Sequence, residues 1–296
     1  MTEQPFAENQ DMALNLVDLD RYPIGGPDQA RCAEFLQSCQ EQMEEKGWCN
    51  LDGFIQPDAL VALTAEANEL MPTAENLTIK RNIYQGKADP SLPKGDPRRR
   101  EYVHRAVQLA DDQIPAESLI QRLYKSDLLT DFIRRVQRKS TLYRCTDQFQ
   151  ALNIVALQPE SWHAWHYDTI ECTVTLLLQA AERGGEFTFI PNSRTDEAED
   201  RETVDQFLAG DMSKAETFGR GAGTFTLFRG GYSLHGVTKV EGQRPRITAI
   251  MTYDEQPDRL ISDDVNIRIY GKRAERILAA RKSLQPKMHS NRNASP

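Results

Sequence analysis

His166-Tyr167-Asp168 and the later His235 are residues whose types and spacing could hold a metal ion. Two imidazoles and one carboxylate form a facial triad, which occupies one face of an octahedral metal and leaves the other face free, as in non-haem Fe(II) sites. The His-x-Asp spacing suits the end of a β-strand, because residues i and i+2 point to the same side. A buried histidine bonded to a carboxylate is the commoner explanation of the tripeptide alone, so the surrounding sequence must decide.

Arg246 and Thr248 form a second candidate group, because they lie two residues apart on one predicted strand and therefore face the same way. A guanidinium fork beside a hydroxyl donor is suited to binding a carboxylate. Arg244 is the competing cation, but Pro245 places it in the preceding turn. The pattern therefore predicts an anion site at Arg246, while a surface arginine on an edge strand remains the alternative.

The other histidines are less informative. His163 lies three residues before His166 and could be a fourth ligand, a substrate contact or an exposed loop residue. His104 and His289 show no ligand spacing, and His289 falls in a polar tail. Asn153, on the strand before the motif, could donate to a bound molecule or satisfy a neighbouring backbone group.

Several further polar and aromatic residues permit both functional and structural interpretations. Asp147 could bind a substrate ammonium group, or serve as a turn residue after Thr146. Trp162 and Trp165 are more typical of packing than of a site wall. The basic run Arg98-Arg99-Arg100 could contact an anion, but a solvated loop is the simpler explanation.

The chemistry-bearing residues lie in a part of the chain that is rich in strand-forming residues. From Leu142 onward, short Val-, Ile-, Thr- and Phe-rich segments are bounded by Gly or Pro, at 151–157, 171–178, 185–190, 223–228 and 246–253. Several short strands at such spacing predict a barrel or a double-sheet jelly roll. A charged segment at 192–220 interrupts the series and is predicted to be a helical insertion.

The part before Leu142 is predicted to be mainly helical. An irregular arm (1–26) precedes a helix that begins after Asp28 and runs to about Lys46, and a second helix begins at Pro57. The remaining elements expected are a strand at 48–55, a Pro- and Gly-rich loop at 85–100 and helices at 116–125 and 127–138. A basic helix should follow Gly271, and residues 284–296 should form a disordered tail. We expect one α+β domain over 1–296, with residues 1–141 buttressing a β-core at 142–271.

Composition excludes some classes of protein. The chain has 296 residues, of which 39% are hydrophobic, enough for a packed core, and its net charge of −8 argues against a nucleic-acid partner. The five cysteines are odd in number and lack a C-x-x-C pair, which is typical of reduced thiols. No apolar run approaches the length of a membrane helix, so we expect no membrane partner and a cytoplasmic location.

Taken together, these segments resemble the iron(II)- and 2-oxoglutarate-dependent dioxygenases of the double-stranded β-helix (cupin-like) fold. The resemblance spans about Leu142 to Tyr253. It is carried by His166-Tyr167-Asp168, Gly184-Gly185-Glu186-Phe187, Gly223-Thr224-Phe225, His235-Gly236-Val237-Thr238 and Arg246-Ile247-Thr248. More narrowly, Trp165-His166-Tyr167-Asp168, Thr175-Leu176-Leu177-Leu178-Gln179 and Phe228-Arg229-Gly230 are similar to the bacterial branch that hydroxylates or chlorinates free amino acids.

The resemblance implies that His166, Asp168 and His235 bind Fe(II), and that Arg246 with Thr248 binds the distal carboxylate of 2-oxoglutarate. O₂ would be consumed as the cosubstrate is converted to succinate and CO₂. Halogenating members of this branch replace the carboxylate ligand by a small residue, which frees a position for chloride, whereas this sequence keeps Asp168. Hydroxylation of a free amino acid or a related small metabolite is therefore expected. A peptidyl or protein hydroxylase and a non-catalytic cupin-like binding protein remain alternatives, and the oligomeric state is open.

Overall fold

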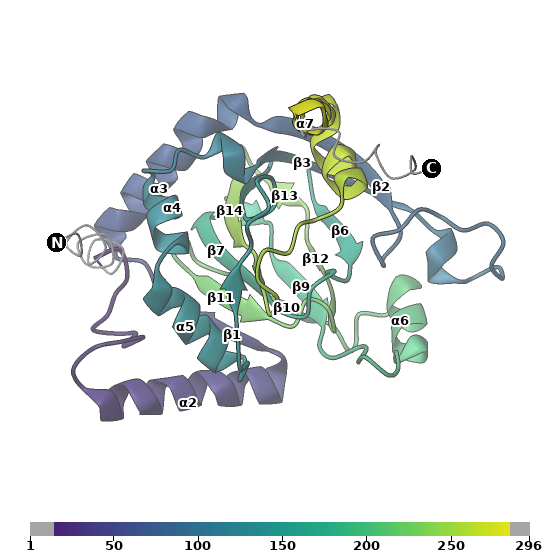
Figure 1. The fold of residues 1–296 in the computed structure, drawn as a ribbon. Coiled ribbons are helices and arrows are strands. Elements are labelled where there is room, and N and C mark those ends of the chain that lie inside the picture. Colours follow the sequence, from purple (N-terminus) through teal and green to yellow (C-terminus); the bar gives the residue numbers. More distant parts are fainter. Residues whose placement is uncertain (1–14, 285–296) are drawn as a thin grey trace, which may run out of the picture.

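The computed structural model describes residues 15–284, which form two packed antiparallel sheets with helices on the outer faces (Figure 1). The major sheet has seven strands in the order β1-β11-β7-β14-β5-β3-β2. Their bounds are Trp48–Leu51 (β1), Phe225–Phe228 (β11), Thr173–Gln179 (β7), Arg246–Met251 (β14), Leu152–Leu157 (β5), Tyr102–Leu109 (β3) and Glu75–Arg81 (β2).

The minor sheet has four strands in the order β10-β9-β12-β6. They span Glu216–Phe218 (β10), Phe187–Ile190 (β9), Leu234–Val237 (β12) and His163–His166 (β6). Two short pairs complete the described strands: β8 (Arg183–Gly184) with β13 (Val240–Glu241), and β4 (Tyr143–Arg144) with β15 (Tyr253–Asp254). This two-sheet arrangement is the expected double-stranded β-helix.

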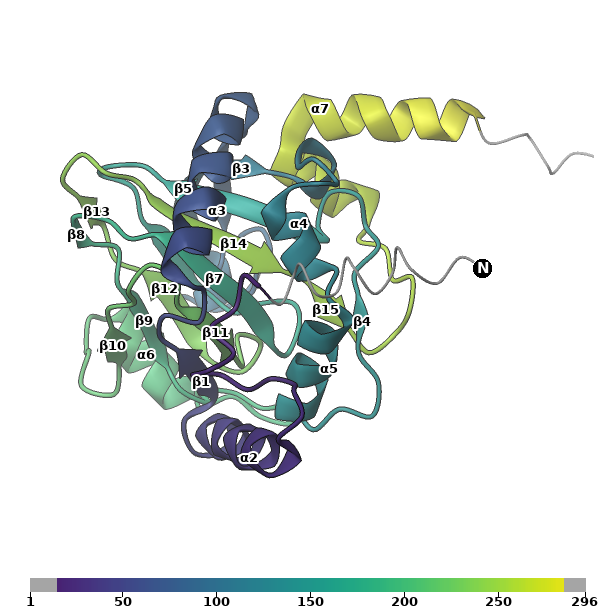
Figure 2. The same cartoon turned by 90° about the vertical axis from the view of Figure 1, so that its left-hand side faces the viewer.

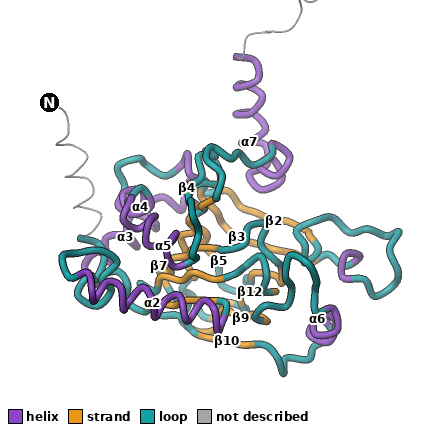
Figure 3. The backbone as a smooth tube through the Cα atoms, turned by 60° about the horizontal axis from the view of Figure 1, so that its bottom comes forward, coloured by secondary structure: helices purple, strands orange, loops and turns teal. Residues whose placement is uncertain are grey.

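Four helices lie on one side of the strands and α6 lies on the other (Figures 1 and 3). The four are α2 (Gln29–Lys46), α3 (Pro57–Leu70), α4 (Leu119–Tyr124) and α5 (Asp127–Val136). As predicted, Asp28 caps α2 by accepting a hydrogen bond from the Arg31 backbone, and Pro57 begins α3. Three short 3₁₀ turns, Met71–Thr73 (η1), Pro97–Arg99 (η2) and Asp111–Gln113 (η3), lie between these elements.

Alternation along β5 and β14 separates the two faces of the major sheet. Ile154 and Ala156, with Ile247 and Ala249, join the large apolar core beneath the helices. The residues between them turn toward the minor sheet, where Val155 and Leu157 pack in a second core with Phe187, Phe189 and Phe228. Arg246 and Thr248 therefore face the space between the sheets, as their spacing predicted.

Helix α6 lies beside the minor sheet, and helix α7 is the last element of the described chain. Helix α6 (Arg201–Leu208) packs Val204 and Phe207 into a third core that includes Ile190 and Leu234. Helix α7 (Asp263–Leu284) is bent at Gly271, whose φ of 58° and ψ of −142° are not helical. Beyond this residue Ala274 and Leu278 still pack in a small core with Phe149 and Tyr270, and only the end of the helix projects from the body (Figure 2). None of the helices within residues 15–284 is long and apolar enough to cross a membrane.

The predicted element pattern needs three corrections. Strands β2 and β3, within the part expected to be mainly helical, were missed although they extend the major sheet. The alternation of apolar and polar residues in these strands is short, and only Leu77 and Ile79 of β2 are buried. The 192–220 segment is not purely a helical insertion, because its β10 pairs with β9. The basic helix begins at Asp263 rather than after Gly271. The predicted tail at 285–296 and the first part of the arm (1–14) lie outside the described residues.

Candidate metal centre

The three predicted ligands converge between the two sheets. Strands β6 and β12 are neighbours, and their register pairs His166 directly with His235. Asp168 follows two residues after His166, and one potential ligand atom from each residue lies within 4.8 Å of the others. The His166 Nε2–Asp168 Oδ1 distance is 3.4 Å, and the His235 Nε2–Asp168 Oδ2 distance is 3.6 Å.

Backbone carbonyls orient both imidazoles. The Nδ1 atom of His166 lies 2.8 Å from the Ala164 carbonyl oxygen, and that of His235 lies 2.9 Å from the Ser233 carbonyl oxygen. If each Nδ1–H donates to its carbonyl, each Nε2 presents its lone pair to the common centre. Burial, followed by the nearby His166, lowers the pKa of His235 to about 4, so this ring is neutral near pH 7, as a metal ligand must be.

The Asp168 carboxylate is held in a closely fitted position. The Thr173 hydroxyl donates to its Oδ2, and the Asp168 backbone N–H donates to the Gly230 carbonyl at 2.9 Å. Burial raises the pKa of Asp168, but His235, His166 and Thr173 together outweigh burial and lower it below its usual value. A Cβ atom at Gly230 would lie 2.1 Å from Asp168 Oδ2, so only glycine leaves room for the carboxylate.

The donor set fits the metal that the sequence implied. Two imidazole nitrogens and one ionised carboxylate oxygen approach a common point, which matches the facial set of non-haem Fe(II) sites. Within residues 15–284 this is the one cluster of three or more His, Cys, Asp or Glu side chains with such geometry.

An inner cavity of about 100 Å³ adjoins the three ligands and contains Arg246 and Thr248. Both side chains are buried, and the Arg246 guanidinium donates to the Thr248 hydroxyl. Burial lowers the pKa of Arg246 to about 10, which still leaves it charged near pH 7. Arg244 is exposed and donates to the Ala181 carbonyl, so Arg246 is the arginine that lies in the cavity.

Sequence reasoning missed a second arginine in the inner cavity. Arg220, just after β10, lines the same space, and its Nη1 donates to the Thr175 and Thr226 hydroxyls at 3.0 and 3.1 Å. Its guanidinium lies over the Phe187 ring, with 4.9 Å between the guanidinium carbon and the ring centroid. No local motif marks Arg220, because only the fold brings the end of the 192–220 segment between the sheets.

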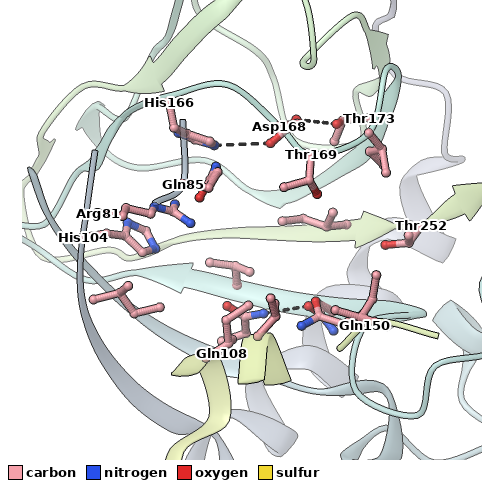
Figure 4. A pocket seen from close by; sticks show the side chains of 18 of the residues that line it. Arg81, Gln85, His104, Gln108, Gln150, His166, Asp168, Thr169, Thr173 and Thr252 are labelled. Atoms are coloured by element: carbon pink, nitrogen blue, oxygen red, sulfur yellow. Dashed lines mark hydrogen bonds and ion pairs between the residues drawn. The ribbon is translucent and has the colours of Figure 1, made fainter. Parts of the chain in front are cut away.

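An outer pocket of about 240 Å³ opens beside His166 and Asp168 (Figure 4). It is walled by β2, β3, β5 and the first turns of α7, and its cations are Arg81 and Arg268. Arg81 Nε is buried and has no hydrogen-bond partner among the described residues. Burial lowers the pKa of Arg81 to about 10, so the guanidinium remains charged near pH 7. Neither arginine was singled out from the sequence, because neither lies in a ligand-like motif.

His163 and His104 both belong to this pocket. The His163 ring stacks on His104 and His166, with ring centroids 4.0 and 4.4 Å apart. Arg81 Nη2 donates to His163 Nε2 at 2.9 Å, and burial, followed by His104, lowers the pKa of His163. His163 is therefore not an exposed loop residue, and its Nε2 is directed to Arg81. The absence of ligand spacing at His104 gave no sign that it lines the pocket.

Asn153 and Asp147 make structural contacts. Asn153 Nδ2 donates to the Phe149 and Leu152 carbonyls, while Oδ1 accepts from Gln108 and Tyr270. The buried Asp147 carboxylate accepts from the backbone of residues 149, 150 and 261 and from the Asn266 side chain. The turn interpretation of Asp147 therefore fits the structure, and its carboxylate is not among the outer-pocket walls.

Replacing Asp147 by alanine should lower the free energy of unfolding by about 3 kcal/mol, because several donors lose a charged acceptor in a buried turn. Urea denaturation of the purified variant measures the loss, and the exposed Asp211 provides the matched control through Asp211→Ala. The folded fraction should keep wild-type kinetics. Unchanged stability combined with a raised substrate KM would instead favour an ammonium-binding role.

The two tryptophans and the 98–100 arginine run lie outside the inner cavity and the outer pocket. Trp162 is exposed, and Trp165 packs edge-on against Phe207 of α6 with 4.7 Å between ring centroids. Arg98 is exposed and pairs with Asp96, whereas Arg99 donates to the Leu92 carbonyl. Packing and loop-stabilising roles therefore describe these residues.

Several solved structures have a fold similar to that of this chain. The carbocyclase SnoK from nogalamycin biosynthesis, described as non-haem and α-ketoglutarate dependent, is 13% identical, with a TM-score of 0.54 over 83% of this chain and 94% of that chain. The epimerase SnoN of the same biosynthesis is 14% identical, with a TM-score of 0.53 over 75% and 82%. AviO1 from Streptomyces viridochromogenes Tue57 is 15% identical, with a TM-score of 0.51 over 75% and 96%. At such identities these similarities show the double-stranded β-helix fold.

The sequence itself matches one protein family over most of its length. A search of curated proteins returned no match. The family described as Halogenase D matches residues 32–270, which include all three metal-ligand candidates and both sheets. With the triad in place on this fold, the chain belongs to the Halogenase D family of the iron(II)- and 2-oxoglutarate-dependent oxygenases.

Proposed function

We propose that this oxygenase hydroxylates an unactivated C–H bond of a free amino acid or a related small metabolite. The observation that carries the proposal is the outer pocket, which adjoins two metal-ligand candidates and contains an arginine with a buried, unpartnered Nε. Its volume of about 240 Å³ suits a small molecule, and a guanidinium of this kind suits a carboxylate. A peptide substrate is less well supported, since the pocket is small and three of its wall residues, Val265, Arg268 and Ile269, come from the first turns of α7.

In this proposal His166, Asp168 and His235 bind Fe(II), and Arg246 with Thr248 binds the distal carboxylate of 2-oxoglutarate. The iron supplies the O₂ chemistry that splits the cosubstrate into succinate and CO₂ while one oxygen atom enters the substrate. The chain's own residues orient both imidazoles through backbone carbonyls, hold the Asp168 carboxylate and present cations at the two cavities. Arg81 and Arg268 hold the substrate so that the target C–H bond faces the metal centre.

The family name raises chlorination as the rival outcome. A halide needs a coordination position, and Asp168 is ionised, held by Thr173 and aimed at the same centre as both imidazoles. The retained carboxylate therefore favours oxygen transfer over halide transfer.

The decisive experiment supplies anaerobically reconstituted Fe(II) protein with 2-oxoglutarate, chloride, pools of free amino acids and then O₂. Mass spectrometry should find one amino acid that gains one oxygen atom, with one succinate formed for each product. Gain of chlorine would reject hydroxylation, and oxidation of peptides without oxidation of any free amino acid would reject the small-molecule substrate. Absence of iron binding would reject the enzyme altogether.

Replacing Arg246 by methionine should weaken 2-oxoglutarate binding on the order of 100-fold, because a buried charge-assisted pair is lost. Steady-state kinetics at varied 2-oxoglutarate should show the change in KM. The exposed Arg244, two residues away, is the matched control, and Arg244→Met should keep the wild-type KM. A larger effect at Arg244 than at Arg246 would reverse the assignment.

A further inference from the structure

We infer that Arg220 is a second anion-binding residue of the cosubstrate cavity, acting with Arg246 on the distal carboxylate of 2-oxoglutarate. This inference rests on the proposed function and deepens it. In this inference Arg220 helps the cavity to select a 2-oxo acid with two carboxylates over one with a single carboxylate.

The first argument is the place of Arg220 in the fold. It lies between β10 of the minor sheet and β11 of the major sheet, and its side chain enters the inner cavity from this connection. Thr175 and Thr226, on neighbouring strands of the major sheet, accept hydrogen bonds from its Nη1. The Phe187 ring lies against one face of the guanidinium. These contacts hold the side chain in one orientation inside the cavity.

The second argument is charge. Arg220 and Arg246 line the same cavity of about 100 Å³, and their mutual repulsion adds to burial in lowering the pKa of Arg220. Among the described residues that line the cavity the one carboxylate is Asp168, a metal-ligand candidate. The acidic residue that acts on the pKa of Arg220 is Asp52, which is exposed and accepts a hydrogen bond from Thr224. A buried Arg246 and a half-buried Arg220, without a dedicated carboxylate, indicate a site for an anionic ligand.

The third argument is an unused donor. Arg220 Nε is buried and has no hydrogen-bond partner among residues 15–284. A purely structural arginine would have its donors satisfied, since an unmade buried hydrogen bond is costly. Thr175 and Thr226 accept from Nη1, so Nε remains available to a ligand.

The test measures binding rather than turnover. Calorimetry on the full chain loaded with Mn(II), which binds to the same donor set without completing the reaction, gives affinities for 2-oxoglutarate and for 2-oxobutyrate, which lacks the distal carboxylate. In Arg220→Met the 2-oxoglutarate affinity should fall roughly 10- to 100-fold, as loss of a charge-assisted hydrogen bond predicts. The 2-oxobutyrate affinity should stay within about twofold of wild type. Arg244→Met is the matched surface control.

Thermal unfolding separates a ligand-binding role from a structural one. Without cosubstrate, Arg220→Met should have a Tm close to that of the wild type, because the loss of its hydrogen bonds to Thr175 and Thr226 is offset by removal of the repulsion with Arg246. It should lose most of the Tm gain that 2-oxoglutarate gives the wild type. If Arg220→Met does not fold, Arg220→Lys keeps the charge without the fork and should bind 2-oxoglutarate about 3- to 10-fold more weakly than wild type.

Wild-type 2-oxoglutarate affinity in the variants would overturn the inference while leaving the proposed function intact. Equal losses for both 2-oxo acids would also overturn it, because they would indicate general damage. Failure of the wild-type Mn(II) protein to bind 2-oxoglutarate would instead reject the proposed function.

Discussion

Replacing Asp168 by alanine is expected to abolish hydroxylation, with kcat/KM lowered on the order of 1,000-fold or more, or about 4 kcal/mol at 1.4 kcal/mol per factor of ten. The carboxylate is the one anionic member of the donor set, and both imidazole Nε2 atoms lie within 3.6 Å of it. Its loss removes a ligand and the charge that offsets the metal. Product formation by mass spectrometry and Fe(II) affinity by competition with a chromogenic chelator would measure the two effects.

The control for Asp168→Ala is Asp196→Ala, which removes an exposed carboxylate that accepts a hydrogen bond from Tyr232 and should leave turnover unchanged. Asp168→Gly, tested with chloride present, shows whether the carboxylate decides between hydroxylation and chlorination. It opens the coordination position that halide transfer requires, so any product should carry chlorine instead of oxygen. Full hydroxylation by either Asp168 variant would show that another residue is the third ligand.

Replacing Gly230 by alanine should lower turnover on the order of 100-fold without unfolding the chain. The added Cβ would lie 2.1 Å from Asp168 Oδ2 and 2.9 Å from Asp168 Cγ, so the carboxylate must move. A displacement of about 1 Å at a reacting centre costs a factor on this order. Fe(II) affinity should fall in parallel, while urea denaturation should show little change in the metal-free protein.

Gly221→Ala is the control for Gly230→Ala, because a Cβ at Gly221 meets no atom within 4 Å. The double variant Asp168→Gly/Gly230→Ala tests the stated cause. With the carboxylate absent the added methyl group has nothing to displace, so its effect on Fe(II) affinity should largely disappear. An undiminished effect of Gly230→Ala in the Asp168→Gly background would place the damage elsewhere, for example at Phe228, whose Cε2 lies 2.9 Å from the added carbon.

The strands of the core were well predicted where both faces are buried. The apolar runs at 151–157 and 246–253 correspond to β5 and β14, whose side chains are buried at nearly every position. Strand β2 was missed because it is an edge strand of the major sheet, with buried residues at only two positions. Such short alternation gives a weak signal, although Arg81 at its end contributes a cation to the outer pocket.

Residue types and local spacing were enough to predict the metal-ligand candidates and the Arg246-Thr248 pair, because period-2 geometry determines which side chains share a face of a strand. The double-stranded β-helix followed from the number and spacing of apolar segments. The Halogenase D match and the fold comparisons confirm the superfamily and the fold.

Only the tertiary structure brought Arg81, His104, Arg220 and Arg268 to the two cavities, from four separate segments of the chain. It also showed that Asp147 and Asn153 satisfy buried backbone groups and neighbouring side chains. Local sequence cannot determine these outcomes, because a side chain's surroundings in a packed core depend on which distant strands and helices lie against it. The charge of the pockets is set by that long-range packing, whereas the metal-binding motif is set by a histidine at the end of one strand, an aspartate two residues later and a histidine on the neighbouring strand.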